Sequence, residues 1–466
     1  RVLSEEAVWR KLFSAIESGK PKAARQAADL LSKPVEKATD ELLENSARYL
    51  DKRASAGSIS NARLTALALA RRAQDNPEDA AVRMNATWAS RLPPELKAWA
   101  WAQIGRQAGF KSLPESATHY RAAWEAFDRA PAAALPGWSD ETLAWGVRAA
   151  LKASDTLSWR LILRSVEQMS AQEQKESSWQ FWRARALKET ARSGAEGQAQ
   201  REEAQRALSA IASPLSFYGK LATEELGRKI QLPPKPLQPT AAEREAAQGH
   251  AGLERALRLL ALGLRSEGVR EWNFSLRGMN DRQLLAAAQW ACDREVWDRC
   301  INTSDRTQQE IDLEQRFPTP FRQDVIAKAA EIGIDPAYVY GLIRQESRFV
   351  TDARSHVGAS GLMQVMPATA KWTAKKIGLP FKPEMITDRD ANLKIGTSYL
   401  KLVLEDFGGS QAMAAAAYNA GPSRPRRWRE GVALEAAAWA ETIPFNETRD
   451  YVKKVLSNAT LYSALP

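Results

Sequence analysis

Cysteine and histidine are scarce in this chain. Its 466 residues include two cysteines, Cys292 and Cys300, and three histidines. Two cysteines are too few for a framework of disulfides. The histidines His119, His250 and His356 are far apart in sequence, and no His-Glu-x-x-His or Cys-x-x-Cys spacing occurs. The sequence therefore predicts no metal ion, and it offers no motif for another cofactor.

The spacing of the two cysteines leaves their redox state open. On one straight helix, Cys292 and Cys300 would lie about 12 Å apart, which is beyond the reach of a disulfide. A helical hairpin between them would instead bring the two side chains together. Both arrangements are compatible with the sequence.

Long apolar runs and strand patterns are also missing. No uninterrupted apolar stretch approaches the roughly 20 residues of a membrane-spanning helix, which excludes a membrane-embedded body. No segment shows the alternation of β-branched and polar residues, bounded by turn residues, that is typical of strands. Helix-forming Ala, Leu, Arg, Glu and Gln are frequent instead. The sequence therefore predicts an all-α fold, and its length predicts roughly two to four domains.

Residues 1–230 predict an irregular α-superhelix. The segments 140–153, 156–169 and 177–190 each carry a helical apolar stripe, and short polar breaks separate them. No fixed period of the tetratricopeptide or ankyrin kind is present, so we expect stacked helical hairpins of unequal size. Tryptophan recurs between positions 99 and 182. We expect most of these rings to pack the hairpins together and few to stack on sugars.

A proline-rich stretch divides the chain. Residues 231–240 read QLPPKPLQPT, and four prolines in ten positions exclude a helix interior. We expect a semi-rigid linker here, followed by a small helical linker domain, the two together covering 231–315. Residues 316–466 then form a separate C-terminal α domain.

A carboxylate on an apolar helix face marks the candidate site. Asp335-Pro336 is a strong helix start, and the helix is expected to run on through Phe349. Glu346 falls on the helical stripe formed by Val339, Leu342 and Ile343. Burial favours the neutral form of a carboxyl group, as a general acid requires. On this feature alone, a core glutamate paired with an arginine is the simpler alternative.

Two further segments add to the site. GASGLMQVMP at 358–367 is a glycine-punctuated loop that leads into a helix with an early proline, and glycines allow a backbone to approach a ligand closely. SQAMAAAAYNAGP at 410–422 predicts a helix of small residues that ends with Tyr418 and Asn419 near an open face. Neither segment is specific when taken alone.

Taken together, four motifs closely resemble a known family. Gln345-Glu346-Ser347, GASGLMQ, AYNAGP and ETIPFNETRDYV follow one another in the order found in the soluble lytic transglycosylases, periplasmic enzymes of Gram-negative bacteria that cleave peptidoglycan. The resemblance covers about the last 150 residues and implies a lysozyme-like domain there, with a superhelix before it that curls into a ring. It also implies a periplasmic protein, so we expect a secretion signal to have been removed ahead of Arg1.

The resemblance carries roles to individual residues. Glu346 corresponds to the family's single catalytic acid/base. Positions that line the family's glycan groove, or lie beside its catalytic glutamate, correspond to Ser355, Gln364, Met366, Tyr418, Asn419 and Glu447, with Glu441 as a less certain neighbour. The chain departs from the family pattern at His356, where proline is expected, and at Ser423, where glycine is expected. Both departures concern local loop shape.

The missing second carboxylate predicts the reaction. Ordinary retaining and inverting glycosidases use two carboxylates, whereas only Glu346 stands in the acid position here. Asp352 could be its partner, but we expect it on the surface. By the resemblance, Glu346 protonates the bond oxygen between N-acetylmuramic acid and N-acetylglucosamine and then takes the proton of the muramoyl 6-hydroxyl. The expected product is a 1,6-anhydro sugar.

Three alternatives remain at this point. A true muramidase would use Glu346 but admit water. A scaffold that binds cell-wall synthesis proteins through its solenoid would use the C-terminal domain only to bind glycan. Nucleic-acid binding would fit the net charge of +10 and the arginines of 424–429. Because no nucleic-acid module pattern is present, we expect an acidic glycopeptide and no nucleic acid as the partner.

Overall fold

The computed structural model describes residues 4–131, 137–155 and 157–465, and these residues form an all-α protein. In these ranges the only β features are isolated bridges that join Arg354, Ser360 and Val365. The predicted fold class is confirmed. Three predicted boundaries lie outside the described residues: the start of the superhelix at Arg1, the end of the C-terminal domain at Pro466 and the helix start at Thr156.

The helices form two compact units, which we describe separately. The first runs up to Ile211 and also includes Arg426–Arg449. The second contains Ala212–Pro425 and the chain from Asp450 onward.

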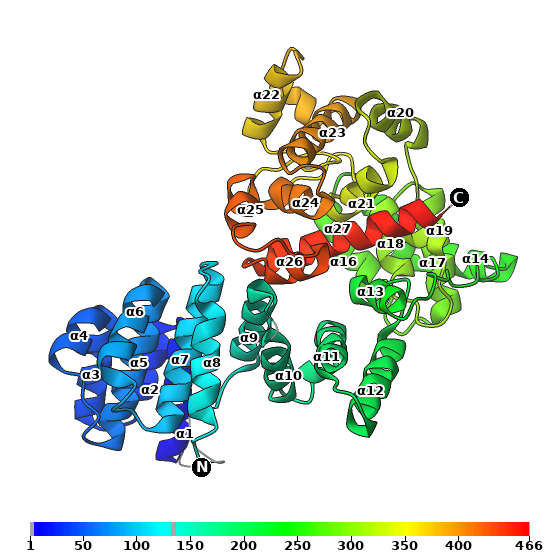
Figure 1. The fold of residues 1–466 in the computed structure, drawn as a ribbon. Helices are drawn as coiled ribbons and strands as arrows, with labels where there is room; N and C mark the ends of the chain where they lie inside the picture. The colour runs from blue at the N-terminus through cyan, green and yellow to red at the C-terminus, as the bar shows by residue number, and fades with distance from the viewer. Residues whose placement is uncertain (1–3, 132–136, 156, 466) are drawn as a thin grey trace. The chain divides into compact units, whose positions relative to one another are not determined.

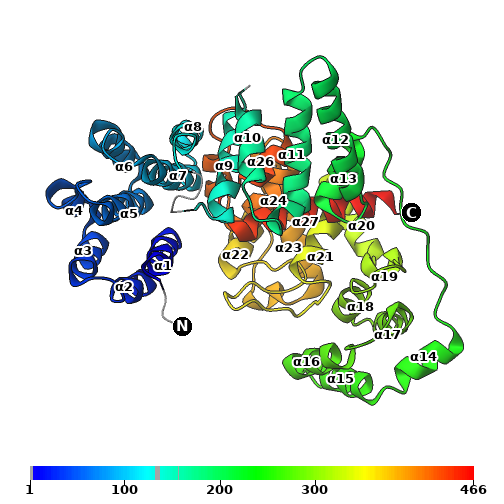
Figure 2. The same cartoon turned by 90° about the horizontal axis from the view of Figure 1, so that it is seen from below.

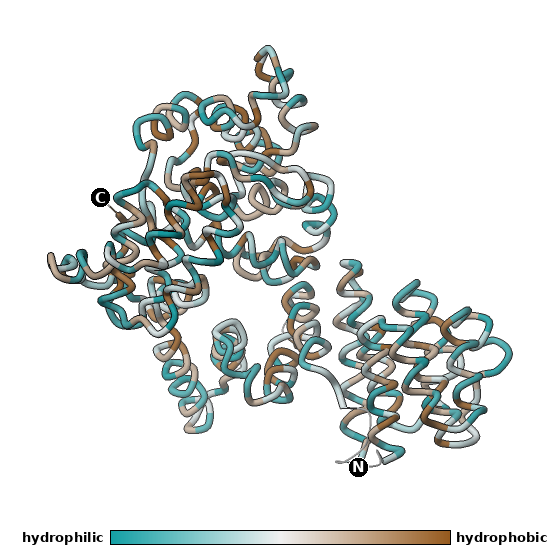
Figure 3. The backbone as a smooth tube through the Cα atoms, turned by 180° about the vertical axis from the view of Figure 1, so that it is seen from behind, coloured by the Kyte–Doolittle hydropathy of each residue, from teal (hydrophilic) through white to brown (hydrophobic). Residues whose placement is uncertain are grey.

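The first unit is a series of helical hairpins (Figure 1). Its helices are α1 (Glu5–Glu17), α2 (Pro21–Ala28), α3 (Lys33–Glu44), α4 (Ser46–Lys52), α5 (Ile59–Asp75), α6 (Pro77–Arg83), the short η1 (Met84–Trp88), α7 (Pro94–Phe110), α8 (Ser116–Phe127), α9 (Asp140–Ala153), α10 (Ser158–Glu167), η2 (Glu173–Lys175), α11 (Ser177–Thr190), α12 (Ala195–Ile211) and α26 (Ala436–Thr442). Hydrophobic and hydrophilic residues alternate along these helices, as expected of amphipathic helices (Figure 3).

Local sequence explains where these helices begin. α9 starts as predicted because the Ser139 side chain accepts a hydrogen bond from the amide of Thr142. α10 starts at Ser158, where a carboxylate oxygen of Asp155 accepts hydrogen bonds from the amides of Leu157 and Ser158. The recurrent tryptophans pack between hairpins, as Trp99 and Trp182 illustrate, because both are completely buried.

A C-terminal segment belongs to this first unit. α26 packs on α9, and a buried ion pair joins Arg148 Nε to Glu441 Oε1 at 3.2 Å. Lys152 Nζ also donates a hydrogen bond to the Trp428 carbonyl at 2.8 Å. Part of the predicted C-terminal domain is therefore built into the same compact unit as the hairpins.

The second unit contains the linker helices and most of the C-terminal domain. Its helices are α13 (Phe217–Glu225), α14 (Ala241–Gln248), α15 (Ala251–Ala261), α16 (Arg265–Ser275), α17 (Asp281–Asp293), α18 (Trp297–Ser304), α19 (Leu313–Arg316), α20 (Arg322–Ile332), α21 (Pro336–Glu346), α22 (Pro367–Lys376), η3 (Pro383–Ile386), α23 (Arg389–Asp406) and α24 (Gln411–Ala420). Two further helices, α25 (Ser423–Trp428) and α27 (Asn446–Ala464), begin in one unit and end in the other. The proline-rich stretch before α14 contains no helix, as predicted, and Figure 2 shows it as a long extended segment.

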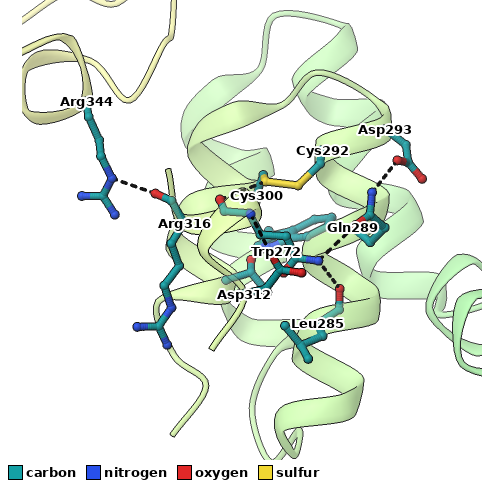
Figure 4. The surroundings of a disulfide bond; sticks show 11 residues. Trp272, Leu285, Gln289, Cys292, Asp293, Cys300, Asp312, Arg316 and Arg344 are labelled. Carbon is teal, nitrogen blue, oxygen red and sulfur yellow. Dashed lines mark hydrogen bonds between the residues drawn. A yellow bond between two sulfur atoms is a disulfide. The ribbon is translucent and has the colours of Figure 1, made fainter. Parts of the chain in front are cut away.

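The two cysteines form a disulfide, so the hairpin alternative is the correct one. Cys292 near the end of α17 and Cys300 in α18 have their Cα atoms 5.0 Å apart (Figure 4). The turn between the two helices contains Glu295 in the left-handed region, with φ of 57°. The core below the hairpin includes Leu253 and the completely buried Trp272.

No helix within the described ranges is both long enough and apolar enough to cross a membrane. In the same ranges, no group of three or more His, Cys, Asp or Glu residues is arranged to hold a metal ion.

A buried lysine lies where α13 meets α27. Lys220 is 7% exposed, and its Nζ donates a hydrogen bond to Ser457 Oγ at 2.6 Å. Burial, followed by the positive charge of Arg344, lowers the pKa of Lys220 to about 8. Because the unfolded chain keeps an ordinary lysine pKa, the folded state carries a free-energy penalty at neutral pH that disappears as the pH rises from about 8 to 10.5.

We therefore expect Lys220→Met to raise the free energy of unfolding at pH 7 by up to about 3 kcal/mol. The gain over the wild type should shrink between pH 8 and 10.5, where the wild-type lysine loses its charge. Urea unfolding at pH 7, 9 and 10.5 measures this. Lys454→Met, on the exposed side of α27, is the matched control and should give a small, pH-independent difference. A gain at Lys220 that does not vary with pH would contradict the explanation.

Candidate active site

The helix that carries Glu346 begins as predicted and ends earlier. Asp335 caps α21 by accepting a hydrogen bond from the amide of Ala337 at 2.8 Å. The helix was expected to reach Phe349 but ends at Glu346. Ser347 Oγ donates to the Leu362 carbonyl at 2.7 Å and accepts from the Phe349 amide. Arg348 and Phe349 then adopt φ of 48° and 67°, so the chain leaves the helix directly after Glu346.

Glu346 lies at the end of the predicted apolar stripe. Val339, Leu342 and Ile343 are completely buried, and Glu346 itself is half-buried. Tyr451, on α27, donates a hydrogen bond from its hydroxyl to Glu346 Oε1 at 2.5 Å. This contact fixes the carboxyl group between two helices.

Two tyrosines stay protonated beside this carboxyl group. Burial, then the charge of Glu346, raises the pKa of Tyr451 well above the usual value of a phenol. The same two causes, in the same order, raise the pKa of Tyr418. Tyr418 donates its hydroxyl hydrogen to the Met363 carbonyl at 2.8 Å, which fixes the ring against the glycine-punctuated loop. Both phenols are therefore hydrogen-bond donors at neutral pH.

The glycine-punctuated loop is held from behind by one buried amide. Asn392, on α23, is 1% exposed; its Oδ1 accepts from the Met363 amide at 2.8 Å, and its Nδ2 donates to the Ser360 carbonyl at 2.9 Å. Gly361, with φ of 80°, has no room for a side chain, because a Cβ would lie 2.3 Å from Asn392 Nδ2. Sequence reasoning missed Asn392. The signal that identified Glu346, a polar residue on the apolar stripe of a helix, could also have identified Asn392.

The loop also uses the predicted groove residues for its own hydrogen bonds. Gln364 Nε2 donates to the carbonyls of Ala353 and Gly361 at 3.0 and 2.9 Å. Ser355 Oγ accepts from the Ala359 amide at 2.9 Å. Both polar side chains therefore contribute to the shape of the loop.

The remaining predicted residues occupy different environments. Met366 is 39% exposed at the start of α22, and Asn419 is half-buried in the last turn of α24. Glu447 is exposed in the first turn of α27. Glu441 is 1% exposed and bonded to Arg148. Glu441 and Glu447 fall in the first compact unit, whereas Glu346 and the other predicted residues fall in the second.

Asp352, the alternative second carboxylate, is exposed as expected. It borders a cavity of about 500 Å³ whose lining includes Trp297 and Phe321 but not Glu346. The lining comes from the linker helices and from the segments that contain Phe321 and Phe349.

Arg344, two residues before Glu346, holds this helix to its neighbours. Its Nε donates to the Arg316 carbonyl at 2.8 Å, and its Nη2 donates to both carboxylate oxygens of Asp305 at 3.2 Å (Figure 4 shows the first bond). The guanidinium also lies over the ring of Phe317, 4.4 Å from its centre. Sequence reasoning missed this residue, since its partners come from a part of the chain assigned to the linker.

Three protein families match parts of the chain. Residues 324–438 match the transglycosylase SLT domain, and residues 246–309 match the L domain of soluble lytic murein transglycosylases. Residues 442–466 match the helical domain of soluble lytic transglycosylases.

Individual proteins of known name are similar to this chain as well. The soluble lytic murein transglycosylases of Salmonella typhimurium and Escherichia coli K12 are 33% and 32% identical over 298 residues, which cover 63% of this chain. The match covers 44% of each relative, so it spans less than half of their length. The crystal structure of an inactive Glu-to-Gln mutant of the lytic transglycosylase Slt from Pseudomonas aeruginosa is similar with a TM-score of 0.75 and 29% identity. That similarity covers 99% of this chain and 73% of the other.

We expect Arg344→Met to destabilise the protein by about 1–3 kcal/mol, because it leaves the Arg316 carbonyl without this donor and Asp305 without its charge partner. Chemical denaturation with an Asp305→Asn double-mutant cycle separates the pair from other effects. Arg389→Met removes an arginine from exposed ion pairs with Asp324 and Asp390 and should cost about 0.5 kcal/mol or less. Equal costs for the two arginines would contradict a special role for Arg344.

Proposed function

We propose, from the premise that this chain belongs to the soluble lytic transglycosylase family, that it cleaves the β-1,4 bond between N-acetylmuramic acid and N-acetylglucosamine in peptidoglycan. The product would carry 1,6-anhydro-N-acetylmuramic acid, and the process would be cell-wall remodelling and turnover. The observation that carries the proposal is Glu346 itself: a half-buried carboxyl group at the end of an apolar stripe, bonded to one phenol and close to a second.

In the proposed reaction Glu346 acts first as acid and then as base. Its proton passes to the oxygen of the glycosidic bond, and the bond from that oxygen to C1 of the muramoyl residue breaks. The resulting carboxylate takes the proton of the muramoyl 6-hydroxyl as that oxygen bonds to C1. The substrate's own N-acetyl group stabilises the positive charge at C1 between the two events. The glutamate ends in its starting form, and no water is consumed.

The two tyrosines have different roles in this reaction. The bond from Tyr451 stabilises the carboxylate that exists after the first proton transfer. Tyr418, fixed to the Met363 carbonyl, would position the substrate beside Glu346. The inactive Pseudomonas relative, which carries glutamine in place of a glutamate, supports a glutamate as the essential group.

The groove assignments follow the surroundings of each residue. For Met366, Asn419 and Glu447, the family motifs support contact with the glycan. Ser355 and Gln364 would line the groove through the loop that they stabilise. For Glu441, the buried bond to Arg148 favours an indirect role in holding α26.

Compartment and partners complete the proposal. The Cys292–Cys300 disulfide favours an oxidising compartment, which supports the periplasm. Peptidoglycan glycan strands are the proposed substrate, with no nucleic acid. Cell-wall synthesis proteins could bind the hairpins of the first unit, because stacked hairpins offer broad surfaces.

Glu346→Gln should lower the turnover of purified cell-wall sacculi by at least 10²-fold, since general acid catalysis is typically worth 10²- to 10⁴-fold. Its thermal unfolding should stay close to that of the wild type, because the amide can still accept the Tyr451 hydrogen bond. Asp352→Asn is the matched control and should keep wild-type turnover. Residual activity of Glu346→Gln within about tenfold of the wild type would mean that another group supplies the proton.

The products distinguish a lytic transglycosylase from a muramidase. Digestion in heavy-oxygen water should give muramic ends without solvent oxygen, lighter by one water than reducing ends and resistant to borohydride. The reason is that the internal 6-hydroxyl is already held near C1, which avoids the entropic cost of ordering a water molecule. Mass spectrometry of the released muropeptides measures this. Mostly labelled, reducible ends would identify a muramidase that uses the same glutamate.

A further inference from the structure

Trp372 differs from every other tryptophan of the chain. All 16 tryptophans lie among the described residues, and Trp372 is the only one that is exposed, with 48% of its surface accessible. The others pack inside the hairpins or between helices. An indole ring exposed to water forgoes the burial that this chain gives to its other tryptophans. The position of Trp372 therefore needs its own explanation.

The ring belongs to a row of aromatic side chains that leads to the candidate active site. Trp372 on α22 contacts Tyr399 on α23 edge-on, with ring centres 6.3 Å apart. Tyr399 in turn contacts Tyr418 on α24, with ring centres 5.3 Å apart. The charge of Glu346 contributes to the raised pKa of Tyr418. Trp372 is thus two ring contacts from Tyr418, so it lies outside the immediate surroundings of Glu346.

The neighbourhood of Trp372 suits a sugar ring. α22 begins directly after Met366, an exposed residue of the predicted groove. The Lys376 ammonium lies 5.6 Å from the centre of the Trp372 ring and adds a cationic donor to the apolar surface. An amphipathic sugar presents C–H groups to an aromatic face, whose negative charge distribution attracts them, and presents hydroxyl or carboxylate oxygens to a cation.

We propose that Trp372 is a stacking platform for a sugar of the glycan strand outside the pair that Glu346 separates. The identity of the ligand rests on the proposed function. The platform gives the protein a preference for longer strands, because a strand must extend past the cleaved bond to reach the ring. Lys376 assists by binding oxygens of the same segment.

Binding without turnover tests the platform directly. In the Glu346→Gln background, calorimetry measures the Kd of a peptidoglycan tetrasaccharide and of an octasaccharide or longer strand. Trp372→Ala should weaken binding of the long strand by about three- to tenfold and that of the tetrasaccharide by less than about twofold. Trp372→Phe should restore most of the loss. The matched control is Phe274→Ala, which removes an aromatic ring of α16 that is 62% exposed and lies under the guanidinium of Arg277. This control should change neither Kd.

Cleavage by the otherwise wild-type protein is the second measurement. Trp372→Ala should raise KM for long strands more than it lowers kcat. Equal losses on short and long strands, or no loss on long strands, would overturn the platform. If the wild type cuts no glycan while long-strand binding still depends on Trp372, the proposed function fails and the platform stands. Failure of any glycan to bind would overturn the platform as well.

Discussion

The buried guanidinium of Arg344 is the constraint on which the candidate site depends. A charge that is removed from water must be paired and hydrogen-bonded, and Arg344 finds its partners in Asp305, the Arg316 carbonyl and the Phe317 ring. Its Nη1 also contacts Asn458 on α27, the helix whose Tyr451 binds Glu346. One side chain thus connects the helix of the acid, the helix of its phenol and the end of the linker domain.

This connection makes the linker domain part of the site's framework. Asp305 follows α18 directly, and the disulfide fixes α18 against α17 (Figure 4). Cys300 Sγ lies 3.4 Å from the Gln315 carbonyl, next to the residue whose carbonyl accepts from Arg344. Arg316 itself is anchored to the Ser304 and Thr307 carbonyls. The hairpin joined by the disulfide therefore supports the backbone that binds Arg344 of α21.

The sequence predicted local features well and long-range contacts poorly. Asp335-Pro336 fixes the start of α21 through a cap and a proline, both visible in neighbouring residues. Glu346 was found because a helix period of 3.6 places it on an apolar stripe. Arg344 was missed because its hydrogen-bond partners lie 28 to 114 residues away. Asn392 was missed because the loop residues that it binds lie 29 and 32 residues away. For the two cysteines, the sequence left two alternatives, a straight helix and a hairpin, because their spacing alone does not show where a helix breaks.

The phenols around Glu346 restrict how protons can move at this site. Tyr451 and Tyr418 both keep their hydrogens at neutral pH, because burial and the nearby carboxylate raise their pKa values. Neither can serve as a base there, and each already donates a hydrogen bond. Of these three groups, Glu346 is therefore the one that we propose to exchange a proton with the substrate. A single group that must both give and take a proton suits a nucleophile already attached to the substrate, which is why this arrangement favours an internal hydroxyl over a separately activated water.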